Sequence, residues 1–154
     1  MSGDEDGLVF ATGEADDATE TAPQGVPAMS GQVRVLLADD NGRFRQLLRR
    51  LLEREAGIVV VAEASNGAEA LELAEVHVPD VVLMDLSMPG VDGLEATLEL
   101  KSRIPQVAVL MLSVADKEHE IAAGLAGGAS EFLVKGTPAA EIVAAIRRYG
   151  PETE

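Results

Sequence analysis

The chain has 154 residues, a formal net charge of −15, 47% hydrophobic residues and no cysteine. This length suits one domain with a short extension, and the acidity argues against a nucleic-acid-binding surface, which needs Lys and Arg opposite the phosphates. Disulfides and thiolate–zinc sites are excluded, and the absence of a long apolar run and of a basic, apolar start predicts a cytoplasmic protein without membrane spans or secretory signal.

Residues 1–32 form an acidic leader that differs from the rest of the chain. They hold seven acidic residues and no basic residue, and they lack the periodicity of helices and strands. We interpret them as a disordered extension, in which the apolar triplet at 8–10 is better explained as a chance feature than as a docking motif. The sequence becomes periodic at 33–149, which predicts one domain, and a tail follows at 150–154.

Five short apolar runs in the periodic part are typical of buried strands. An amphipathic helical segment follows each of them. Such strict alternation predicts an α/β fold with a parallel sheet, helices on both faces and right-handed crossovers. Continuous apolar strands agree, because the strands of such a sheet are buried on both sides. The predicted strands are 33–38, 58–61, 81–84, 107–112 and 132–134.

The predicted helices have recognisable starts. The fourth, at about 116–126, is expected to be weakly anchored because Ile121 and Leu125 are its large apolar residues. The fifth is expected to have Thr137 as its N-cap and Pro138 as its first residue. The predicted N-caps of the first three helices are Asn41, Asn66 and Asp92.

Polar residues gather where the predicted strands end, which is the edge at which open α/β sheets bind ligands. Each of them could be an ordinary turn, cap or solvated residue. Five on one edge are hard to ascribe to chance, and clustered carboxylates repel one another unless something neutralises them. These residues are Asp39 and Asp40 after the first strand, Asp85 after the third, Ser113 after the fourth and Lys135 after the fifth.

This set of side chains suits phosphoryl transfer assisted by a hard cation. Mg²⁺ prefers oxygen ligands and keeps several waters, so two or three protein oxygens are enough. A lysine supplies positive charge for an anion beside the metal, and a serine hydroxyl can donate to a phosphoryl oxygen. An aspartate can attack phosphorus to give an acyl phosphate.

The same positions resemble the receiver domain of two-component response regulators, over about residues 33–149. The segment 66–71 and the turn 128–130 are similar to the subgroup that usually precedes a LuxR-type DNA-binding domain. The resemblance implies a flavodoxin-like, doubly wound sheet of five parallel strands in the order 2-1-3-4-5. The matching positions are Asp39, Asp40, the segment 82–93, Ser113 and Lys135.

The resemblance implies that Asp85 is the phosphoacceptor and that a histidine kinase or phosphotransfer protein is the donor. Ser113 and Lys135 would contact the phosphoryl group, and Phe132 matches an aromatic switch position, although core packing would also explain it. The expected output face is the surface of helix 4, strand 5 and helix 5, acting on an unidentified protein. A receiver assists its own phosphorylation and dephosphorylation, so we expect no separate turnover substrate.

The resemblance also implies the magnesium ligands. Asp40 and Asp85 would bind Mg²⁺ directly, Asp39 directly or through water, and Ser87 through its backbone carbonyl. One departure is Gly136, which stands where receivers often have proline after the lysine, and it puts a cis-peptide turn there in doubt.

Three alternative functions fit the sequence less well. A receiver-like interaction module that is never phosphorylated would be expected to lack pocket residues, yet all five are present. An aspartyl-phosphate hydrolase typically has a second aspartate where Ser87 stands, and a dinucleotide-binding domain needs a Gly-rich turn where this chain has Asp39 and Asp40. Left open are the kinase, the output target, a phosphorylation-dependent homodimer, and whether the chain is a stand-alone receiver or part of a longer protein.

Overall fold

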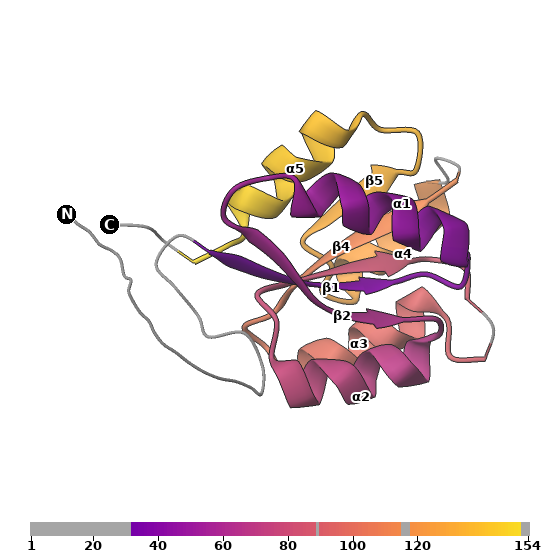
Figure 1. Cartoon of the computed structure of the whole chain (residues 1–154). Coiled ribbons are helices and arrows are strands. Elements are labelled where there is room, and N and C mark those ends of the chain that lie inside the picture. Colours follow the sequence, from indigo (N-terminus) through magenta and orange to yellow (C-terminus); the bar gives the residue numbers. More distant parts are fainter. Residues whose placement is uncertain (1–31, 89, 115–117, 152–154) are drawn as a thin grey trace.

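A computed structural model describes residues 32–88, 90–114 and 118–151. Over these ranges it contains five parallel strands in the order β2-β1-β3-β4-β5, with a helix after each strand (Figure 1). The predicted flavodoxin-like fold and its strand order are therefore confirmed. The strands are β1 (Val33–Ala38), β2 (Ile58–Ala64), β3 (Val81–Asp85), β4 (Ala108–Ser113) and β5 (Glu131–Val134). The helices are α1 (Gly42–Glu53), α2 (Gly67–His77), α3 (Gly93–Arg103), α4 (Glu118–Ala126) and α5 (Ala139–Arg148).

Some predictions fall outside the described residues. The acidic leader at 1–31 lies there with its apolar triplet, as do the first two residues of the predicted fourth helix and the end of the C-terminal tail. Among the helices of the described ranges, none has both the length and the apolar character that crossing a bilayer requires.

Helices cover both faces of the sheet, so the central strands β1, β3 and β4 are almost entirely buried, while the edge strands β2 and β5 are only partly buried (Figure 1). One apolar cluster joins the sheet to α1 and α5, including Leu48, Leu52 and Ile146. The other joins it to α2 and α3, including Ala74 and Leu100. The continuous apolar strands of the sequence thus serve two cores at once, as expected for a parallel sheet.

The predicted N-caps of the first three helices are confirmed. The Asn41 side chain accepts hydrogen bonds from two amides of the first turn of α1, and Asn66 accepts from the Glu69 amide at 2.8 Å. The Glu69 carboxylate in turn accepts from the Ser65 amide at 2.6 Å, one residue before the cap. The Asp92 side chain accepts from the Glu95 amide at 3.0 Å. These bonds satisfy amides that have no partner within a helix.

The start of the fifth helix differs from the prediction. Pro138, not Thr137, occupies the N-cap, and no side-chain bond caps this helix. The reason is geometric, because Pro138 has an extended ψ of 145° while its carbonyl already accepts from the Glu141 amide at 2.9 Å. Thr137 therefore lies one residue too early to reach the first free amides, and α5 begins at Ala139.

The anchoring of α4 was also predicted wrongly in one respect. Leu125 is 47% exposed and does not anchor the helix. Gly124 faces the core instead, where a Cβ atom would lie only 3.0 Å from the Met111 sulfur. Because this glycine has no side chain, the α4 backbone approaches the sheet closely at this point.

Candidate functional site

The carboxyl ends of four strands bring the predicted residues to one edge of the sheet. Asp39 and Asp40 directly follow β1, Asp85 ends β3, Ser113 ends β4 and Lys135 follows β5. The strands are parallel and adjacent in the order β1-β3-β4-β5, so these positions are neighbours in space although they span nearly a hundred residues of sequence.

Lys135 and two buried acids form the centre of the site. The Lys135 Nζ atom lies 2.8 Å from Asp39 Oδ2 and 3.6 Å from Asp85 Oδ1. Both aspartates are 4% exposed. Burying two carboxylates is costly unless they are paired, and one ammonium group compensates them only in part.

The acids are arranged so that they could hold a cation. Asp39, Asp40 and Asp85 each offer a carboxylate oxygen, and these oxygens lie within 4.8 Å of one another. Asp40 is exposed while the other two are buried, so the cluster opens to solvent on one side. A set of oxygen ligands with an open side fits Mg²⁺, which takes oxygen ligands and keeps several waters.

Asp85 has a strongly shifted pKa. The pKa is raised to about 7, chiefly by burial and next by the nearby charge of Asp39. The Lys135 charge and the Ser87 amide, 3.3 Å from Asp85 Oδ1, act in the opposite direction. A carboxyl group with this pKa takes up a proton near neutral pH unless another cation neutralises the site.

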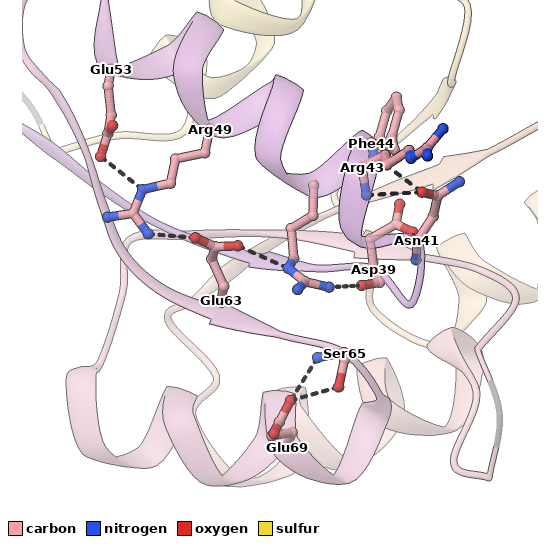
Figure 2. A network of polar contacts seen from close by, with 10 residues as sticks. Asp39, Asn41, Arg43, Phe44, Arg49, Glu53, Glu63, Ser65 and Glu69 are labelled. Atoms are coloured by element: carbon pink, nitrogen blue, oxygen red, sulfur yellow. Dashed lines mark hydrogen bonds and ion pairs between the residues drawn. The ribbon is translucent and has the colours of Figure 1, made fainter.

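Asp39 is fixed at both its backbone and its side chain. Its amide donates to the Ala64 carbonyl of β2 at 3.0 Å, and its Oδ1 accepts from the Asn41 amide at 2.8 Å. Asn41 in turn caps α1, so the same turn that starts the helix also orients the acid (Figure 2).

Phe44, in the first turn of α1, also belongs to the site, although it was not among the residues predicted for it. The Lys135 ammonium lies 4.7 Å from the centroid of its ring, within the range of a cation–π contact. The signal in the sequence was its place in the first turn of the helix that begins beside Asp39 and Asp40.

The remaining predicted residues lie around this centre. Ser113 is buried at 6% exposure at the end of β4, and its backbone carbonyl accepts from the Lys135 amide at 2.7 Å. Ser87 is exposed, and its amide bonds Asp85 as described above. Phe132 pairs with Met111 across β4 and β5 and packs, partly buried, against the core on the α2–α3 side.

Comparison with known proteins gives a consistent result. Residues 35–147 match the family described as the response regulator receiver domain. The chain is 40% identical over 116 residues to the transcriptional regulatory protein DegU of Brevibacillus brevis, covering 75% of this chain and 49% of that protein. It is 43% identical over 115 residues to the response regulator UvrY of Escherichia coli K12, covering 75% of this chain and 53% of that protein.

Solved structures agree with the sequence matches. The signal receiver domain of NarL from Mycobacterium tuberculosis superposes with a TM-score of 0.72 at 40% identity, covering 75% of this chain and 93% of that chain. The chain spans about half the length of the curated relatives it matches.

Proposed function

The chain belongs to the response-regulator receiver family of two-component phosphorelay signalling, and we propose that its Asp85 accepts a phosphoryl group in a Mg²⁺-assisted reaction. The observation that carries the proposal is the buried Asp85 carboxylate with two further acids and the Lys135 ammonium around it. The proposed donor is the phosphohistidine of a histidine kinase or phosphotransfer protein.

In the proposed reaction an Asp85 carboxylate oxygen attacks phosphorus. A new O–P bond forms while the bond from phosphorus to the nitrogen of the donor breaks, and the leaving nitrogen takes that electron pair. The product is an acyl phosphate on Asp85. The attack requires the ionised carboxylate, so the proton that the raised pKa of Asp85 favours must first be displaced.

The proposed metal ligands are Asp39, Asp40 and Asp85, together with the backbone carbonyl of Ser87. A bound Mg²⁺ would offset the negative charge of the carboxylates and of the arriving phosphoryl group. The buried position of Asp39 and Asp85 keeps both carboxylates turned toward the same small volume.

Two residues are proposed to bind the phosphoryl group after transfer. Lys135 lies 3.6 Å from Asp85 and can pair with a phosphoryl oxygen there. Ser113 stands at the end of the adjacent strand and can donate its hydroxyl hydrogen to another.

The proposed output face is the surface of α4, β5 and α5. A movement of Ser113 toward the phosphoryl group would change packing behind β4, where Phe132 lies across from Met111. α4 packs on this region at Gly124, where a Cβ atom, if one were present, would lie 3.9 Å from the Phe132 ring. The conformational signal would then reach an unidentified protein, in the cytoplasm and without direct contact of this chain with nucleic acid.

Intact-mass measurement tests the proposal. Wild type incubated with acetyl phosphate and Mg²⁺ should gain the mass of one phosphoryl group, and Asp85→Asn or added EDTA should abolish the gain. A folded wild type that gains no mass under these conditions would favour the alternative, a receiver-like interaction module that is not phosphorylated.

A further inference from the structure

Arg45 connects the acidic site to the neighbouring strand. It lies in the first turn of α1, and its Nη1 donates to the backbone carbonyl of Asp39 at 2.6 Å. The Nε atom of the same guanidinium donates to Glu63 Oε1 near the end of β2 at 2.8 Å. One planar group thus ties the chain after β1 to β2 with two charge-assisted bonds.

Glu63 is itself held from a second side. Its other carboxylate oxygen pairs with Arg49 one turn further along α1, and Arg49 also pairs with Glu53 at 3.0 Å. Figure 2 shows Glu63 between Arg49 and the loop that carries Asp39. Burial alone would raise the pKa of Glu63. The hydrogen bonds and charges of Arg49 and Arg45 outweigh burial, so the pKa lies below its usual value. Glu63 therefore remains charged and holds Arg45 in one orientation.

Arg45 contacts the peptide group that positions Asp40. The Asp39 carbonyl belongs to the peptide that joins Asp39 to Asp40, so its direction sets the course of the chain into Asp40. The amide of Asp39 is fixed on β2 by Ala64, and the carbonyl is fixed by Arg45. Asp40 follows directly with an exposed side chain, so the position of its carboxylate depends on this peptide.

We propose that Arg45 is a positioning residue for cation binding, which acts by fixing the Asp39–Asp40 peptide through the Asp39 carbonyl, with Glu63 as its support. The inference rests on the proposed function, because it assumes that the three aspartates bind Mg²⁺. Partners that orient metal ligands typically contribute 10–100-fold to affinity, which is the effect expected here.

Charge and positioning make opposite predictions for the loss of Arg45. A guanidinium near the site repels a divalent cation, so removal of its charge alone should tighten Mg²⁺ binding. Removal of a positioning bond should weaken it. The sign of the change therefore separates the two roles.

The test uses the full chain with Arg45→Met, Arg45→Lys and the matched control Arg49→Met. Arg49 shares the helix, the charge and the Glu63 partner, but it bonds Glu63 and Glu53 rather than Asp39. Isothermal titration with Mg²⁺ should give a dissociation constant raised about 10-fold or more for Arg45→Met. The dissociation constant of Arg49→Met should stay within about twofold of the wild-type value. Arg45→Lys keeps the positive charge but lacks the planar guanidinium that bonds two partners at once, so its dissociation constant should resemble that of Arg45→Met.

A second readout needs no metal. The Asn41 amide donates to Asp39 Oδ1, so hydrogen exchange at this amide in EDTA should be faster in Arg45→Met than in Arg49→Met. If Arg45→Met does not fold, Glu63→Met replaces it, because it removes the oxygen that accepts from Arg45 Nε and keeps a side chain of similar length. The same loss of affinity is expected there, and an unchanged value would contradict the inference.

Failure of the inference and failure of the proposed function look different. Unchanged or tighter Mg²⁺ binding by Arg45→Met, beside a wild type that binds, overturns the positioning role alone. A wild type that binds no Mg²⁺ overturns the proposed function and this inference with it.

Discussion

The Lys135 ammonium lies closer to Asp39, at 2.8 Å, than to the proposed phosphoacceptor Asp85, at 3.6 Å. The lysine is thus shared between two buried carboxylates and is paired more tightly with the one that would not react. Burial and the charge of Asp39 together outweigh it at Asp85, whose pKa is raised. The arrangement lowers native-state stability at the carboxylate that we propose to be the phosphoacceptor.

We expect Asp85→Asn to stabilise the protein in EDTA. The folded pKa of Asp85 is about 7, against about 3.9 for an unfolded aspartate, so the folded state holds more protons between these values. The free energy of unfolding should therefore fall as pH rises from about 4 to about 7 and stay low above it. Asp85→Asn removes this loss, which is on the order of a few kcal/mol at pH 8.

Urea unfolding at pH 5 and pH 8 in EDTA measures the effect. The free energy of unfolding of Asp85→Asn should exceed that of wild type by more at pH 8 than at pH 5. Glu72→Gln, which removes one exposed charge on α2, is the control for net charge. It should not alter how steeply the free energy of unfolding falls with pH. An equal gain at both pH values would contradict the assignment of the slope to Asp85.

Mg²⁺ should stabilise the native protein. A cation that binds only the folded state at 100 times its dissociation constant adds about 2.7 kcal/mol to the free energy of unfolding. Asp40→Asn should abolish most of this gain, and it should leave the fold intact because Asp40 is exposed. Thermal unfolding with increasing MgCl₂, against NaCl of equal ionic strength, measures it. A melting temperature that rises equally with both salts would contradict the proposed Mg²⁺ site.

Most of the fold could be predicted from the sequence because parallel strands need two apolar faces and leave a clear pattern. β2 nevertheless runs three residues beyond its predicted end at 61, through Glu63 to Ala64. A charged residue in a strand looks like its end, but the arginines of α1 pair with Glu63 and allow the strand to continue. That pairing is a tertiary contact, so local pattern could not reveal it.

The gathering of Asp39, Asp40, Asp85, Ser113 and Lys135 at one edge of the sheet could be predicted, because these residues lie at or directly after the ends of apolar runs. The contacts that orient them could not. Phe44 and Arg45 are consecutive residues of an amphipathic helix. From the sequence pattern, Phe44 is expected in the core and Arg45 on the surface. Their partners, Lys135 and the Asp39 carbonyl, come from other elements, and only the three-dimensional structure brings them together.

The contact between Phe44 and Lys135 gives a further prediction. Phe44→Leu should lower stability by roughly 0.5–1 kcal/mol more than loss of apolar area alone, because the cation–π contact is lost. It should also slow phosphorylation by acetyl phosphate several-fold, since Lys135 is held less firmly beside Asp85. Phe44→Tyr keeps an aromatic face and serves as the control, with a rate close to wild type. Equal rates for Leu and Tyr would show that the ring does not orient the lysine.

Gly93 offers a test of how closely the start of α3 packs on Asp85. A Cβ atom at this position would lie 2.2 Å from the Asp85 carbonyl oxygen, a distance that forces the backbone to move. Gly93→Ala should therefore cost about 1–3 kcal/mol of stability and weaken Mg²⁺ binding, because the proposed ligands Asp85 and Ser87 lie on the displaced segment. Urea unfolding and isothermal titration measure the two effects. Gly136→Ala is the matched control, since a Cβ there meets nothing within 4 Å, and it should change neither quantity. If both alanine variants behaved alike, the close approach of α3 to Asp85 would not be what sets the geometry of the site.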